Sequence, residues 1–102
     1  MEQQNYSEVI PALEGLWSGS LSRARDGIFT TEDDRIIRET LGAVDIGEPD
    51  LMPRAFVTLL WFMPQFMEWQ ISRVAERTNL DQEYRNLCLW VSERIGEILG
   101  NP

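Results

Sequence analysis

The stretch AFVTLLWFMPQFM, from Ala55 to Met67, decides the fold of this 102-residue chain. Eleven of its thirteen residues are apolar, counting Pro64, and they fall on every side of a helix or strand. A chain of this length builds a modest core, which can cover only part of such a surface. We therefore expect the remainder to be buried against a second copy of the chain or against a partner protein.

Apolar residues recur at three- and four-residue steps on both sides of this stretch, which indicates helices. The first predicted helix covers residues 7–27, with Ser7 as its N-cap and a glycine at its end. The second covers residues 30–42, and the last begins at Asn79 or Asp81 and ends at residue 100. The glycine and proline of the segment 45–49 predict a loop.

The third predicted helix contains the apolar stretch and runs from an Asp50 cap to about Thr78. At 1.5 Å per residue it would be about 40 Å long. Pro64 removes one backbone hydrogen bond, so we expect a kink about one turn earlier. Two helices broken at Pro64 are the less favoured alternative, because the apolar period continues through the proline. The sequence thus predicts one all-α domain over residues 1–102. We expect a small antiparallel bundle of about four helices, the third long, strongly apolar and kinked near Pro64.

The apolar residues of the third predicted helix fall into two stripes. We assign one stripe to the core; it contains Phe56, Leu60, Met63, Met67, Ile71 and Val74. The second stripe contains Leu59, Phe62, Phe66 and Trp69. We regard it as surplus apolar surface, although it would be internal if the helix contacts neighbours on two sides. Aromatic residues are enriched at protein interfaces, and Trp61 lies outside both stripes. We therefore predict a partner-binding surface formed by Leu59, Trp61, Phe62, Phe66 and Trp69.

The composition argues against several classes of ligand. All nine basic residues are arginines, and seventeen carboxylates give a net charge of −8. This charge repels phosphate groups, so we expect no nucleic-acid or membrane binding. The apolar run is also shorter than the roughly 20 residues that cross a bilayer. The lone Cys88 suits a reducing compartment, and the acidic N-terminus does not resemble a signal peptide. We predict a cytoplasmic location.

The sequence offers little for catalysis. Without histidine or lysine, the chain lacks the commonest general base, Schiff-base chemistry and nitrogen ligands for a metal. Cys88 lies on the inner stripe of the last predicted helix, where a buried and inert thiol is expected. We therefore predict that the protein is not an enzyme and has no catalytic, cofactor-binding or metal site.

These observations favour a small cytosolic regulatory protein that binds and sequesters another protein through an apolar helix face. An anti-activator that inhibits a transcription regulator would work in this way, and a homodimer would bury the same patch twice. The alternative is an immunity protein or antitoxin that neutralises a basic toxin. It would use the acidic residues of segments 32–34 and 45–50, and its affinity would fall with salt.

Overall fold

The computed structural model describes residues 5–46 and 51–100, which fold into helices without a strand. The helices are α1 (Tyr6–Ser18), α2 (Ser20–Arg25), α3 (Thr31–Gly42), α4 (Arg54–Trp61), α5 (Met63–Trp69), α6 (Ile71–Arg77) and α7 (Asp81–Leu99). The expected all-α class is confirmed. The expected number of about four helices is wrong, because two of the predicted helices are divided.

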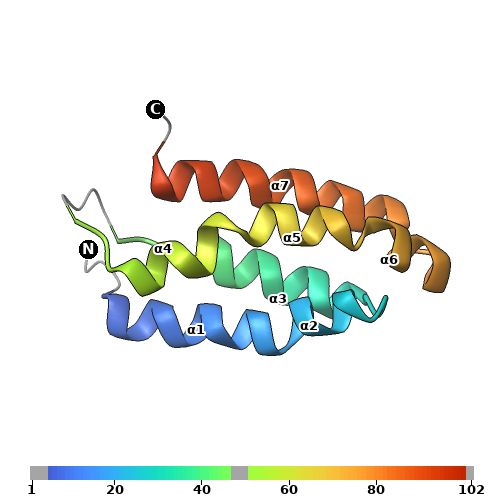
Figure 1. Ribbon diagram of the computed structural model, residues 1–102, viewed down its shortest axis with the longest axis horizontal. Coiled ribbons are helices and arrows are strands. Elements are labelled where there is room, and N and C mark those ends of the chain that lie inside the picture. Colours follow the sequence, from blue (N-terminus) through green and yellow to red (C-terminus); the bar gives the residue numbers. More distant parts are fainter. Residues whose placement is uncertain (1–4, 47–50, 101–102) are drawn as a thin grey trace.

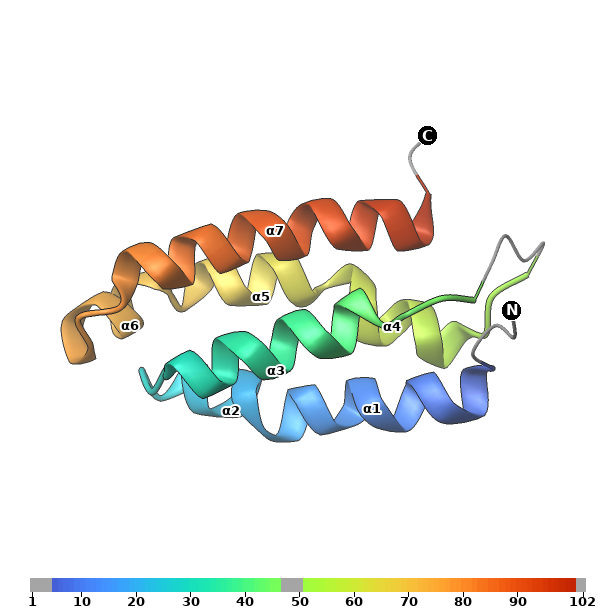
Figure 2. The ribbon, with the colours of Figure 1, turned by 180° about the vertical axis from the view of Figure 1, so that it is seen from behind.

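The helices run roughly along the long axis of the molecule, which measures 42 × 26 × 23 Å. α1 and α2 follow one another along one edge, and α3 returns beside them (Figure 1). α4, α5 and α6 then run in succession in the first direction, and α7 returns along α5 and α6. Seen from behind, α3 lies between α1 and α7 (Figure 2).

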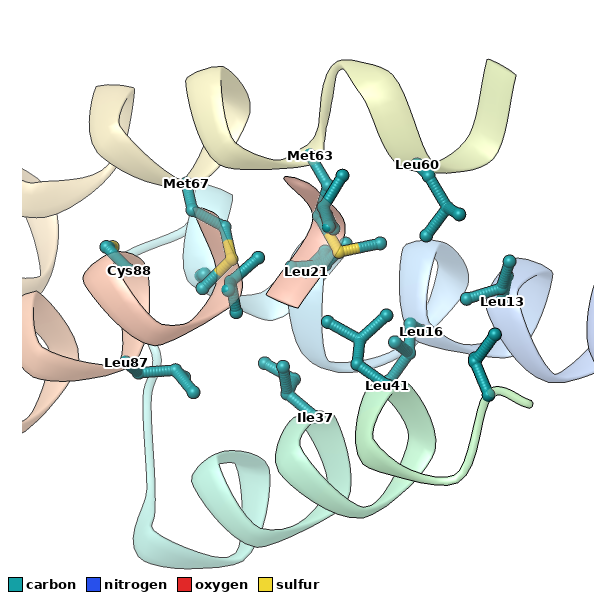
Figure 3. Close-up of a cluster of buried hydrophobic side chains, with 14 of the residues drawn as sticks. Leu13, Leu16, Leu21, Ile37, Leu41, Leu60, Met63, Met67, Leu87 and Cys88 are labelled. Atoms are coloured by element: carbon teal, nitrogen blue, oxygen red, sulfur yellow. The ribbon is translucent and has the colours of Figure 1, made fainter. Parts of the chain in front are cut away.

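The core assigned to the apolar segment is confirmed. Phe56, Leu60, Met63, Met67 and Val74 have no exposed surface, and Ile71 packs against them at the edge. Figure 3 shows the side chains of Leu60, Met63 and Met67 directed toward leucine and isoleucine side chains of α1, α2, α3 and α7. One face of the segment therefore holds the bundle together.

The single long third helix is a wrong prediction, and the first break in it lies at Phe62. Pro64 occupies one of the first two positions of α5, where its missing N–H costs no helical hydrogen bond. The same proline inside a continuous helix would leave the carbonyl of Leu60 without its donor. Ending α4 at Trp61 and starting α5 at Met63 avoids that cost.

A second break lies at Gln70, a buried residue for which the sequence carries no proline or glycine signal. Its side-chain amide donates to the carbonyl oxygen of Phe66 at 3.2 Å. Its backbone N–H bonds instead to the carbonyl of Met67, three residues earlier. The chain therefore forms one turn of the 3₁₀ type at Gln70. The α-helical hydrogen bonds resume with the bond from the Val74 N–H to the Gln70 carbonyl.

The first predicted helix is likewise divided, at Gly19, into α1 and α2. A Cβ atom at this position would lie 2.9 Å from the carbonyl oxygen of Gly15, so the local backbone fits glycine alone. The N-cap is Asn5 and not Ser7, because the Asn5 side chain accepts the N–H of Glu8.

The other helix limits agree with the expectations where the structure describes them. Thr30 caps α3 through a reciprocal pair of hydrogen bonds with Asp33, and α7 ends at Leu99. Pro53 is the N-cap of α4. The predicted Asp50 cap and most of the predicted loop lie outside the described residues. Within the described ranges, no helix combines the length and apolarity required to cross a membrane.

Candidate protein-binding surface

Five aromatic side chains from three helices form one connected group, which we call the aromatic surface. It consists of Trp17 of α1, Trp61 of α4, Phe62 between α4 and α5, and Phe66 and Trp69 of α5. Four of these residues belong to the predicted partner-binding set. The structure brings them together on one side of the bundle.

Phe62 is the centre of the aromatic surface. Its ring centroid lies 5.5 Å from that of Trp61 and 5.2 Å from that of Trp69. The Trp69 contact is edge-to-face, which is a favoured arrangement of aromatic rings. Phe62 is itself half-buried, so the two tryptophans flank a ring that the fold already holds in place.

Trp17 fixes the aromatic surface to the first helix. Its ring stacks parallel to Phe62 at 6.5 Å and meets the edge of Phe66 at 5.0 Å. Its indole N–H donates to the carbonyl oxygen of Leu59 at 2.8 Å. Leu59 lies in the last turn of α4, where carbonyls lack helical donors. The hydrogen bond therefore satisfies an acceptor at the helix break and ties α4 to α1.

Trp17 is absent from the predicted partner-binding set. Its position is intermediate, because it is half-buried under Phe62 and Phe66. A signal was present in its spacing: Ile10, Glu14 and Trp17 share one side of α1, and Ile10 and Glu14 line a shallow groove against α4. Leu59, the fifth predicted residue, lines the same groove and is half-buried.

The exposure of the predicted residues is uneven. Trp61 is 62% exposed and Trp69 is 59% exposed, whereas Leu59, Phe62 and Phe66 are half-buried. The second stripe is thus partly internal, since Trp17 covers one side of it. What remains open is the pair of tryptophans, and burying such rings from water is strongly favourable.

The residues one turn away from the two tryptophans are mostly uncharged. Thr58, Gln65 and Ser72 are exposed beside them on α4, α5 and α6. Arg73 is the charged neighbour, and its guanidinium donates to the carbonyl of Arg25 and to the side chain of Gln70. Charge close to the two tryptophans is therefore limited to Arg73 and to the exposed Glu68, which directly precedes Trp69.

The acidic residues 32–34 are engaged within the fold. Glu32 and Asp34 form ion pairs with Arg35 and Arg38 on their own helix. The hydrogen bond from Arg35 lowers the pKa of Glu32. Asp45 is exposed, whereas the acidic residues at positions 48 and 50 lie outside the described part of the chain.

Asp33 is buried and holds two helices together. Its carboxylate accepts hydrogen bonds from the Ser20 hydroxyl, the Arg23 guanidinium, and the backbone N–H and hydroxyl of Thr30. Burial acts to raise the pKa of Asp33, but the hydrogen bonds from Arg23, Ser20 and Thr30 outweigh it and lower the pKa. This carboxylate joins α2 to the start of α3 and is not available to a partner.

Cys88 lies on the side of α7 that faces the bundle core, where a thiol is expected to be inert. It is buried, and burial raises its pKa to about 11. The hydroxyl of the neighbouring Tyr84 donates to the carbonyl of Met67 at 2.8 Å, and burial also raises the pKa of that tyrosine. Among the described residues, no group of three histidine, cysteine or acidic side chains is arranged to hold a metal ion.

Comparison with known proteins gave no match: no family model, curated protein or solved structure is similar to this chain. The aromatic surface is therefore interpreted from its own geometry.

Proposed function

We propose that this protein binds another protein through the aromatic surface and sequesters it. The supporting observation is the pair Trp61 and Trp69, which are each about 60% exposed on either side of Phe62. Tryptophan and neighbouring apolar groups dominate the binding energy of many protein interfaces. The partner would present an apolar helix or groove, and it would be unable to use that surface elsewhere while bound.

The role that best fits this mode of binding is that of a cytosolic anti-activator-like inhibitor, which covers the docking or dimerisation surface of a transcription regulator. The small size of the chain and the absence of histidine and lysine support a binding role over catalysis. The immunity-protein alternative is less well supported. It needs exposed and unpaired carboxylates, whereas Glu32 and Asp34 are paired and Asp33 is buried.

The test uses Trp69→Glu, with Leu89→Glu as a matched control. Leu89 is another large apolar residue, 67% exposed, and it lies on α7, which contributes no ring to the aromatic surface. Each tagged variant is used for co-purification from the native host, and the captured protein is then purified and titrated. We expect Trp69→Glu to abolish binding and Leu89→Glu to retain it, with helical circular dichroism unchanged in both.

Salt dependence separates the proposed apolar contact from the acidic alternative. If binding is apolar, the dissociation constant should be nearly the same at low and high salt, because exposed charges contribute little to the binding energy. Binding through carboxylates loses affinity steeply over the same range. An affinity that depends on salt and survives Trp69→Glu would refute the proposed function.

A further inference from the structure

We propose that the free protein is a two-fold symmetric dimer in which the outer face of α4–α6 packs antiparallel against the same face of a second copy. The two-fold axis passes at Gln65. This inference rests on the aromatic surface being a binding surface, as proposed above, and names the partner that covers it when no other protein is bound. Its basis is a symmetric arrangement of exposed side chains.

The first part of this arrangement is the pair of tryptophans. Trp61 lies four residues before Gln65 and Trp69 lies four residues after it, and all three are exposed. In an antiparallel pair with its axis at Gln65, Trp61 of each copy faces Trp69 of the other. The Gln65 amide carries both a donor and an acceptor, so two copies can bond to each other across the axis.

The arrangement extends outward with complementary chemistry. Thr58 and Ser72 lie seven residues from Gln65 on either side, and Arg54 and Glu76 lie eleven residues away. All four are exposed. The antiparallel pair therefore places hydroxyl against hydroxyl and, at each end, an arginine against a glutamate. Neither Arg54 nor Glu76 forms an ion pair with another described residue, although Arg54 shares a groove with Glu14 and Glu76 shares one with Arg25, Arg73 and Arg77.

The spacing places these residues on one continuous face. The steps between them are four, three, four, four, three and four residues, which keeps one side of a helix. Phe62 and Gln70, at the two breaks, keep right-handed helical backbone angles, so the run continues in one direction. The face is about 33 Å long at 1.5 Å per residue, within the 42 Å length of the molecule.

The two tryptophans supply part of the area that a dimer needs. At roughly 250 Å² per tryptophan, the exposed 62% and 59% leave about 150 Å² on each ring. Four such rings in a dimer supply about 600 Å², against about 1,200–2,000 Å² for a stable interface. The remaining polar stripe and the half-buried Phe62 supply further area. The exposed charged residues nearest the axis are Glu68 and Arg73, which have opposite signs, so two copies of net charge −8 can meet here.

The first test combines sedimentation equilibrium with cysteine cross-linking. Gln65→Cys places two thiols at the axis, whereas Ser72→Cys, on the same face, places them about 21 Å apart along the pair. A disulfide needs Cα atoms within about 7 Å. The buried Cys88, with its raised pKa, remains unreactive in both variants. We expect wild type to be a dimer, Gln65→Cys to cross-link under mild oxidation, and Ser72→Cys to remain uncross-linked.

The second test uses charge reversal to fix the register. Arg54→Glu alone, or Glu76→Arg alone, places like charges together twice in each dimer and should raise the dimer dissociation constant about tenfold. The double variant Arg54→Glu, Glu76→Arg exchanges the two partners and should restore the wild-type value. Circular dichroism verifies that each variant is folded.

Three results would overturn the dimer: a monomeric wild type, cross-linking of Ser72→Cys as readily as Gln65→Cys, or no recovery in the double variant. A monomer that still loses a protein partner on Trp69→Glu would refute the dimer and leave the proposed function standing. A dimer that binds no other protein would support the dimer proposal and refute the proposed function.

Discussion

Replacing Trp69 with alanine separates the energy that this residue gives to the fold from the energy that it gives to association. Trp69 is 59% exposed, so of roughly 250 Å² of side-chain surface about 100 Å² is already buried and about 150 Å² remains open. At about 25 cal/mol per Å², the buried part contributes about 2.5 kcal/mol to folding and the open part about 4 kcal/mol to association. We expect Trp69→Ala to weaken the binding of another protein about 1,000-fold, and to weaken the symmetric dimer, which loses two rings, by more.

The measurement has two arms and a control. Urea denaturation followed by circular dichroism gives the free energy of unfolding, at a concentration low enough that the protein is monomeric. Sedimentation equilibrium, or titration with a captured partner, gives the dissociation constant. Phe56→Ala is the control, because Phe56 has no exposed surface and its truncation should cost about 3–5 kcal/mol of folding free energy.

The reasoning fails if Trp69→Ala destabilises the fold as much as Phe56→Ala does, since Trp69 would then belong to the core. It also fails if the variant associates as tightly as wild type.

Three further predictions concern the framework that supports the aromatic surface. Gly27→Ala should cost about 2 kcal/mol of unfolding free energy, because φ is +79° and a Cβ would lie 2.5 Å from Cδ of Arg77. In the same urea titrations Gly15→Ala, where a Cβ has open space, should stabilise by up to about 1 kcal/mol; equal effects would contradict this. Asp33 has a lowered pKa in the fold, so its contribution is present above about pH 4 and is lost as the pH falls further. Asp33→Asn should therefore cost about 3 kcal/mol at pH 7 and flatten the acid limb of the stability profile; an unchanged limb would refute the assignment. Alkylation of Cys88, measured by mass spectrometry, should be slow in the folded protein at pH 8 and fast in urea, because burial raises the pKa of the thiol. Rapid labelling of the folded protein would show that the thiol is accessible.

The parts of the fold that were predictable from the sequence are those governed by local periodicity and capping. α3 and α7 have regular apolar stripes and recognisable ends, such as the Thr30 cap. The buried stripe of Phe56, Leu60, Met63 and Met67 was also predictable, because a 3.6-residue period places these residues on one face.

The breaks were not predictable in the same way, because a local pattern allows more than one backbone path at each of them. At Phe62 the nearby Pro64 allows either a kinked helix or two helices, and the Leu59 carbonyl at the break accepts a hydrogen bond from Trp17, 42 residues away in sequence. At Gln70 the break is accompanied by a side-chain bond to the carbonyl of Phe66, and glutamine is otherwise a good helix former. The aromatic surface was predicted without Trp17, because a stripe on one helix does not indicate which ring of another helix will cover its edge.

The hydrogen bond between Trp17 and the Leu59 carbonyl has a consequence for recognition. Because this bond and the stacked rings lock α4 and α5 onto α1 before any encounter, a binding protein meets a rigid template. Little conformational freedom is left to be lost on docking, so most of the contact energy is retained as affinity. Trp17→Phe would keep an aromatic ring but remove the donor to the Leu59 carbonyl. The contact between α4 and α1 would then be weaker, and we expect a bound protein to dissociate faster.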